Sequence, residues 1–267
     1  MAAGVASARW PVDAAKALDR GRAASAPAVR RRWAPLRVER LAVVFGRNRV
    51  LDGVDLEVGP GEVVALVGAN GSGKSTLLRA VAGFVEPVSG RVDVAGEELD
   101  ALRPDERAAA GVALVSGARP VFPDLSVREN LRVGAYLSHR TRRSFNDAVP
   151  HVLQLVPRLA PLLDRRAGVL SGGEQRHLAV AQTLFRRPAV LLADELTLGL
   201  DAASQASVLS LLRTLADDGV GVVVVDHDLA PLTAAADRTV VLHEGRAEAA
   251  DAQSALVPAR FLGGLAS

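Results

Sequence analysis

One eight-residue stretch constrains the fold more than any other part of this 267-residue chain. Residues 68–75 read Gly-Ala-Asn-Gly-Ser-Gly-Lys-Ser, and Thr76 follows. A short apolar strand pattern over Glu62–Val67 precedes them, and a helical pattern comes after them. Glycines at this GxxxxGK[ST] spacing let the backbone fold closely around phosphate, with amides and the positive helix end facing the anion. The stretch therefore predicts a phosphate-binding loop between a strand and a helix of an α/β domain.

Two side chains of this loop carry specific chemistry. Lys74 would bring a compact positive charge to the β- and γ-phosphates, and the Ser75 hydroxyl is the expected Mg²⁺ ligand. The chain has only two lysines among 32 basic residues, so a lysine at this position indicates a chemical reason. The alternative is a Gly/Ser-rich loop that caps a helix by chance. The predicted nucleotide-binding residues here are Gly68, Asn70, Gly71, Ser72, Gly73, Lys74, Ser75 and Thr76.

A pair of carboxylates follows a second apolar run, Val190–Ala193. Asp194 would hold Mg²⁺ through water, and Glu195 would orient and activate the attacking water. An Asp-Glu pair after a strand is by itself usually a solvated strand end. Together with the phosphate loop it predicts a site that binds a nucleotide with Mg²⁺ and activates water for attack on its phosphate.

Apolar strands alternate with helices along most of the chain, which predicts a parallel core sheet with helices on both faces. An antiparallel pair is predicted at Leu36–Phe45 and Val50–Val58. Further strands are expected at 62–67, 91–94, 112–115, 189–193, 221–225 and 239–243, and helices at 74–82, 173–185, 202–216 and 229–236.

The middle of the chain, about 126–163, has helical spacing that is broken by Pro150, Pro157 and Pro161. It predicts a helical subdomain, at about 118–175, inserted into an α/β domain that spans 36–250. Residues 251–267 are expected to be a short C-terminal extension.

Residues 1–35 form a leader rich in alanine and arginine, with seven basic residues against two acidic ones. We expect it to be disordered, either simply solvated or in contact with anionic lipid or a partner. The rest of the chain is mildly acidic, which argues against a nucleic-acid partner. Apolar runs such as Val220–Val225 are far shorter than the roughly 20 residues of a membrane span. With no cysteine and no secretory signal pattern, an intracellular protein is expected.

Further motifs in the same order resemble those of ATP-binding-cassette (ABC) ATPases, a likeness that covers about residues 36–245. Leu170–Gln175, Leu-Ser-Gly-Gly-Glu-Gln, is similar to the family signature. Phe45 resembles the aromatic that stacks on adenine, although an aromatic at a strand end is often plain core. Asp201 resembles the residue of the loop that crosses to the partner subunit. His227 resembles the histidine that contacts the γ-phosphate, although a lone histidine after a strand is more often structural.

The resemblance implies a P-loop NTPase fold of the ABC type and a dimer. Ser171 is a natural N-cap, and Gly172 and Gly173 open the following helix toward an anion. In the family that helix end faces the nucleotide held by the other subunit, so two chains enclose two ATP molecules.

Within the family, the likeness is greatest to importer ATPases of the branched-chain amino-acid type. It rests on residues 111–115, 121–131 and 167–169. Such importers imply a second ABC ATPase subunit, membrane permeases and, indirectly, an external solute-binding protein, with the chain peripheral on the cytoplasmic face of the cell membrane. Urea and other amide importers share the pattern, so the substrate stays open.

Two positions depart from the family pattern. Gly117 stands where the family has a glutamine or glutamate, and Leu196 stands where it usually has a proline. We expect Gly117 to weaken hydrolysis or coupling while ATP binding survives, and Gly117→Gln to raise transport-linked ATPase activity. We expect Leu196 to make the turn after Glu195 less ordered. The alternatives are a low-turnover regulatory subunit of an asymmetric pair and, less in keeping with one cassette and no heptad run, a non-transport ABC ATPase.

Overall fold

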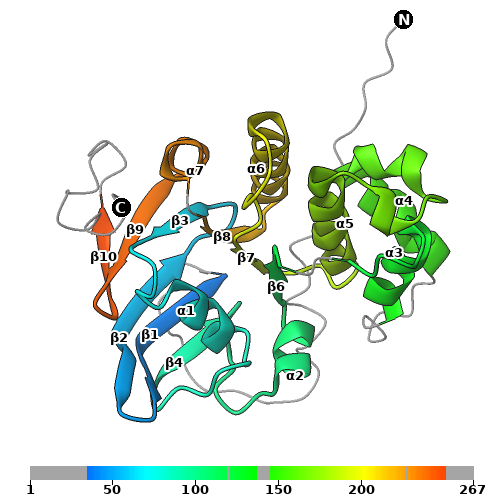
Figure 1. Ribbon diagram of the computed structural model, residues 1–267. Coiled ribbons are helices and arrows are strands. Elements are labelled where there is room, and N and C mark those ends of the chain that lie inside the picture. Colours follow the sequence, from blue (N-terminus) through cyan, green and yellow to red (C-terminus); the bar gives the residue numbers. More distant parts are fainter. Residues whose placement is uncertain (1–34, 119–120, 137–144, 227, 251–267) are drawn as a thin grey trace, which may run out of the picture.

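The computed structural model describes residues 35–118, 121–136, 145–226 and 228–250 (Figure 1). Its centre is a sheet in which five strands run parallel and β10 is antiparallel at one edge. In spatial order the strands are β10 (Arg246–Ala250), β9 (Arg238–His243), β3 (Val63–Val67), β8 (Gly221–Val225), β7 (Val190–Asp194) and β6 (Val112–Ser116). The predicted parallel core sheet is confirmed.

The inner strands of this sheet are buried on both faces, which explains their continuous apolar sequences. In β3, the side chains of Val63, Ala65 and Val67 belong to one hydrophobic core, and those of Val64 and Leu66 belong to the other. Two separate layers must therefore cover the sheet.

The first layer is a second, antiparallel sheet of order β2-β1-β4-β5, together with helix α1. Helix α1 (Lys74–Val81) shares a core with this sheet and with one face of the parallel sheet. The antiparallel strands are β1 (Leu36–Phe45), β2 (Asn48–Val58), β4 (Ser89–Val94) and β5 (Glu97–Glu98). The predicted antiparallel pair is thus confirmed, with β2 starting two residues earlier.

The second layer consists of helices on the opposite face. Figure 1 shows α3, α4 and α5 grouped beyond the β6 edge, with α6 over the sheet. The helices are α3 (Val127–Tyr136), α4 (Phe145–Leu155), α5 (Gly172–Leu184), α6 (Ala202–Asp217) and α7 (Leu229–Ala235), with 3₁₀ turns at Pro157–Leu162 and Ala167–Val169. The break expected at Pro150 is wrong, because α4 continues through it. Pro150 lacks the amide that would donate to the carbonyl of Asn146, and the helix continues without that bond.

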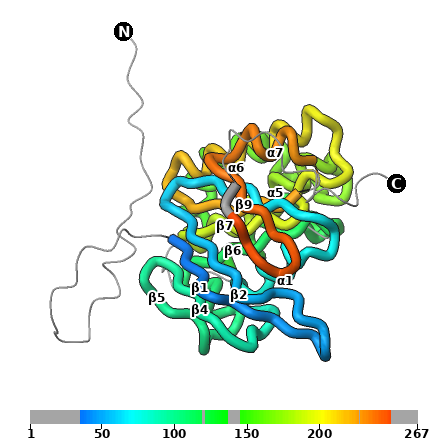
Figure 2. Tube along the Cα trace, turned by 90° about the vertical axis from the view of Figure 1, so that its left-hand side faces the viewer, coloured from blue at the N-terminus to red at the C-terminus, as the bar shows by residue number. Residues whose placement is uncertain are grey.

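Three short elements were not predicted: β5, β10 and helix α2 (Pro104–Ala109). Strand β10 forms a hairpin with β9 and lies beside β2, where the Asp52 amide donates to the Gly245 carbonyl over 2.8 Å (Figure 2). The predicted leader up to residue 34 and the predicted extension 251–267 lie outside the described residues.

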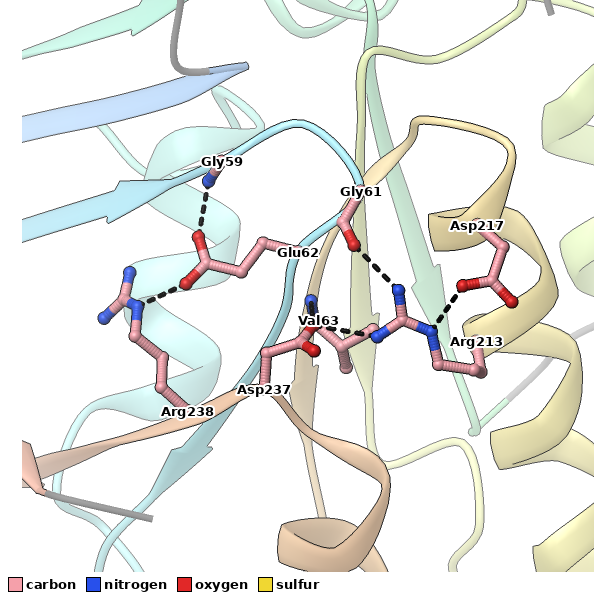
Figure 3. A network of polar contacts seen from close by, with 8 residues as sticks. All are labelled: Gly59, Gly61, Glu62, Val63, Arg213, Asp217, Asp237 and Arg238. Carbon is pink, nitrogen blue, oxygen red and sulfur yellow. Dashed lines mark hydrogen bonds and ion pairs between the residues drawn. The ribbon is translucent and has the colours of Figure 1, made fainter. Parts of the chain in front are cut away.

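A network of polar contacts fixes the start of β3, the strand that leads into the phosphate loop (Figure 3). Arg213 of α6 donates to the Gly61 carbonyl at 2.8 Å and to Asp237 at 2.8 Å. Asp237 in turn accepts from the Val63 amide at 2.7 Å. On the other side of the strand, Glu62 accepts from the Gly59 amide and from Arg238, each at 2.5 Å. These contacts tie the strand to α6 and β9.

Candidate functional site

Residues 68–73 form a tight loop between β3 and α1, and Lys74 and Ser75 begin the helix, as the sequence predicts. A Cβ atom at Gly68 would lie 2.2 Å from the Leu242 carbonyl oxygen. Gly73, the N-cap of α1, has a φ of 105°, and a Cβ there would lie 2.8 Å from a Leu51 methyl group. Only glycine fits both positions, so the backbone of the loop packs against neighbouring strands with no side chain between them.

Lys74 is buried at the first position of α1. Its ammonium donates to the carbonyls of Gly68 and Ala69 at 2.8 and 3.0 Å, so its side chain curls back over the loop. Burial lowers the pKa of this ammonium, and the carboxylates of Glu195 and Asp194 oppose that shift. A partly desolvated cation next to free helix amides is suited to a phosphate group.

The Ser72 hydroxyl supports the same assignment. It is buried and has no hydrogen-bond partner in the part of the chain that is described. A buried hydroxyl without a partner is costly, and a phosphate oxygen would satisfy it. The unsatisfied Ser72 hydroxyl therefore makes the loop suited to bind a nucleotide phosphate.

Ser75 and Asp194 meet as the sequence predicts, although 119 positions separate them. The Ser75 hydroxyl donates to the Asp194 carboxylate over 2.8 Å. Burial raises the pKa of Asp194, whereas the Ser75 hydrogen bond and the charges of Arg79 and Lys74 lower it. Two oxygen ligands, one of them a buried carboxylate, form a donor set that fits Mg²⁺.

Glu195 follows β7 in a left-handed backbone conformation, with a φ of 55°. The single peptide group that joins Asp194 to Glu195 is held at both its carbonyl and its amide. The Asp194 carbonyl accepts from the Gly117 amide at 2.9 Å, and the Glu195 amide donates to the Val225 carbonyl at 2.9 Å. A non-glycine residue in this region is strained and persists only where its surroundings fix it.

The turn at Glu195 has room only because Gly117, which lies next to it, has no side chain. A Cβ at Gly117 would lie 2.1 Å from the Glu195 carbonyl oxygen, closer than any real contact. The expectation that Gly117→Gln raises activity is therefore reversed, because every side chain at 117 would displace the Glu195 backbone. That Gly117 weakens hydrolysis or coupling remains a prediction.

Two residues at this site were not identified from sequence. Arg176 of α5 donates from Nε to the Leu196 carbonyl at 3.0 Å, and the buried Asp226 accepts from the Thr197 amide at 2.9 Å. Asp226 directly follows the apolar run of β8, just as Asp194 follows the apolar run Val190–Ala193, and this position was a usable signal. Leu196 itself is fully buried in the core; the loss of order expected there remains a prediction.

The signature segment begins α5, on the face of the sheet opposite α1. Ser171 is its N-cap, as predicted, and forms a capping box with Glu174. The Ser171 hydroxyl accepts from the Glu174 amide at 3.2 Å, while the Glu174 carboxylate accepts from the Ser171 amide at 2.8 Å. Ser171 and Gly172 are exposed, so this helix end faces solvent.

Asp201 caps α6 next to the signature segment. Its carboxylate accepts from the Ser204 amide at 2.9 Å and from the Ser204 hydroxyl at 2.7 Å, and these bonds lower its pKa. A Cβ at Gly173 would lie 3.2 Å from Ser204, so the first turns of α5 and α6 pack closely.

The remaining predicted residues are Phe45 and His227. Phe45 ends β1 with 52% of its surface exposed, so the reading of it as plain core is wrong, and its proposed contact with adenine remains a prediction. His227 lies outside the described residues. Among the described residues there is no cluster of histidine, cysteine and acidic side chains that could hold a metal ion on its own, and no helix has the length and apolarity of a membrane span.

The parallel sheet and its phosphate loop define the chain as a P-loop nucleotide-binding domain. The family description "ABC transporter" matches residues 51–198, more than half of the chain. The chain is 36% identical over 222 residues to the high-affinity branched-chain amino acid transport ATP-binding protein BraG of Pseudomonas aeruginosa, covering 83% of this chain and 94% of BraG. The chain belongs to the ABC transporter family, as an ATP-hydrolysing subunit.

Other relatives are longer proteins. The chain is 38% identical over 219 residues to the ribose import ATP-binding protein RbsA 2 of Rubrobacter xylanophilus, but spans only 42% of it. Among solved structures, the ADP conformation of the cassette MJ1267 matches with a TM-score of 0.76 and 24% identity, over 86% of this chain and 97% of that one. The dimeric cassette MJ0796 with ADP and phosphate matches with a TM-score of 0.70 and 25% identity, over 81% and 98%.

Proposed function

We propose that the chain couples MgATP hydrolysis to uptake of branched-chain amino acids or related amides through membrane permeases. The observation that carries the ATPase site is the hydrogen bond between Ser75 and Asp194, because it joins the first turn of α1 to the end of the strand that leads to Glu195. The substrate class rests on the likeness to BraG along nearly its whole length. The chain would then lie on the cytoplasmic face of the cell membrane, with no nucleic-acid partner.

The residues of the site support a defined hydrolytic step. The loop amides and Lys74 bind the β- and γ-phosphates of ATP, and Phe45 stacks on its adenine. Ser75, and Asp194 through water, would hold Mg²⁺, which would offset the negative charge of the phosphates. Glu195 takes a proton from water as the water oxygen attacks the γ-phosphorus. The bond between that phosphorus and the bridging oxygen breaks, which leaves ADP and phosphate, and His227 contacts the γ-phosphate.

A second subunit completes each site. Because α1 and α5 cover opposite faces of the sheet, the Ser171–Gly173 helix start, exposed at Ser171 and Gly172, is available to a nucleotide held by another chain. Asp201 lies at the neighbouring helix start and faces the same partner. This supports a dimer with two composite ATP sites, whether of two identical or two different subunits.

A low-turnover subunit of an asymmetric pair is the second candidate. It is favoured by Gly117, which offers no side chain to metal or water. The chain is also similar to ribose and sulfate import proteins, so an uptake assay has to decide the substrate class.

Two measurements test the proposal. Purified chain should hydrolyse MgATP, and Glu195→Gln should lower turnover by about 10²- to 10⁴-fold while nucleotide binding is kept. Expression of the chain in Pseudomonas aeruginosa lacking BraG should restore leucine uptake, whereas the Glu195→Gln variant should not. Turnover without restored uptake would leave the ATPase standing and count against this substrate class.

A further inference from the structure

Arg176 and Asp226 hold the two ends of one peptide group. Arg176 Nε donates to the carbonyl of Leu196 at 3.0 Å, and Asp226 Oδ2 accepts from the amide of Thr197 at 2.9 Å. That carbonyl and that amide belong to the same planar unit, so its orientation is fixed from both sides. The unit begins one residue after Glu195.

The surroundings make this arrangement tight. Leu196 is fully buried and Asp226 is 5% exposed. The free end of the Arg176 guanidinium, Nη2, lies 3.6 Å from where a Gly117 Cβ would stand. The guanidinium therefore occupies the space beside Gly117, next to the strained Glu195 backbone. Burial lowers the pKa of Arg176, and the charge of Asp226 opposes this shift.

Arg176 is also part of the signature helix. It lies one turn after Ser171 and Gly172, whose exposed helix end faces outward. Helix α5 therefore has the exposed cap at its start, and a few residues later Arg176 contacts the turn that contains Glu195. Arg176 of α5 donates directly to the Leu196 carbonyl, and this hydrogen bond is part-buried. A shift of α5 would therefore move the Leu196 carbonyl with it.

We propose that Arg176 is a positioning residue for Glu195, which transmits the position of the signature helix to the carboxylate that activates water in the same chain. It does not touch ATP. The proposal rests on the proposed role of Glu195. Gly117 has no side chain, and the guanidinium of Arg176 lies beside it.

The test uses the full chain with the Arg176→Met and Arg176→Lys variants, and Arg186→Met as a matched control. Arg186 is another half-buried arginine whose pKa is lowered by burial, but it lies just beyond the far end of α5. We expect Arg176→Met to lower kcat about tenfold with KM for ATP within about twofold of the starting chain. Arg176→Lys should recover part of kcat, and Arg186→Met should leave kcat unchanged.

Hydrogen exchange of the segment 190–200 gives a second readout that does not depend on turnover. We expect faster exchange at the Thr197 amide in Arg176→Met and no change in Arg186→Met. An unchanged kcat in Arg176→Met, or an equal loss in the Arg186 control, would overturn the inference. Glu195→Gln is measured beside them: if it keeps full turnover, the proposed role of Glu195 fails instead.

Discussion

The Ser75 hydroxyl donates a hydrogen bond to the Asp194 carboxylate across 2.8 Å, and so joins the first turn of α1 to the end of β7. These are the two oxygen ligands expected for Mg²⁺. Because the carboxylate is buried and its pKa is raised by burial, a cation there would relieve an unfavourable charge.

We expect Ser75→Ala to raise the Mg²⁺ concentration needed for half-maximal turnover at least tenfold, since it removes one ligand. A magnesium titration of ATPase activity measures this. Ser210→Ala, which changes an exposed serine on α6, serves as the control. An unchanged Mg²⁺ requirement in Ser75→Ala would show that this hydroxyl is no ligand.

Gly117→Ala and Gly117→Gln should both lower ATP turnover, by a similar factor. The cause is the Cβ atom they share, which would lie 2.1 Å from the Glu195 carbonyl and push that residue out of place. Steady-state kinetics of the two variants measure the effect. A rise in turnover with Gln but not with Ala would instead restore the expectation drawn from the sequence.

His177 should make stability depend on pH. Its Nδ1 donates to the Gly173 carbonyl at 2.7 Å, so the neutral ring accepts from Ser207 at Nε2, 3.3 Å away. Burial lowers the pKa of His177 below its ordinary 6.5; the Arg158 charge lowers it further, while the Gly173 hydrogen bond and Glu174 oppose this. The unfolded chain then binds more protons, so the free energy of unfolding falls as pH drops below about 6.5.

Replacing this ring with a side chain that does not titrate isolates the effect. His177→Met should lose less stability than the starting chain between about pH 6.5 and pH 5. Urea unfolding at several pH values measures the difference. Parallel pH profiles for the two proteins would refute the assignment.

Arg213→Met should lower the free energy of unfolding by about 1–3 kcal/mol, because the Gly61 carbonyl and Asp237 both lose a charged donor. Arg91→Met, at an exposed position of β4, should change it by less than about 0.5 kcal/mol. Thermal and urea unfolding of both variants test this. Equal effects at the two positions would mean that the contacts around β3 add no stability.

Much of this fold is predictable from the sequence because its signals are local. Apolar runs with glycine boundaries predict β3, β7 and β8, and the glycine spacing predicts the phosphate loop. The strands β5 and β10 were missed because they carry no apolar run: Glu97–Glu98 is held by pairing with β4, and Arg246–Ala250 by pairing with β9. These two strands form because they pair with neighbouring strands, and the local sequence does not indicate that pairing.

In the site, too, some features have local sequence signals and others depend on contacts between distant residues. The loop and the Asp194–Glu195 pair have characteristic spacings, so their positions follow from the sequence. The close approach of Gly117 to Glu195 and the contact of Arg176 with Leu196 join residues from three separate elements. No local sequence signal near Gly117, near Arg176 or near the Glu195–Leu196 turn indicates the other two segments.

The self-contained caps of α5 and α6 bear on how fast two subunits can associate. Ser171 pairs with Glu174 and Asp201 with Ser204 within one chain, so both helix ends are ordered before any partner arrives. A surface that is already ordered loses little conformational entropy on association. The rate at which two subunits associate around ATP would then be limited by their relative orientation on encounter rather than by folding at the interface.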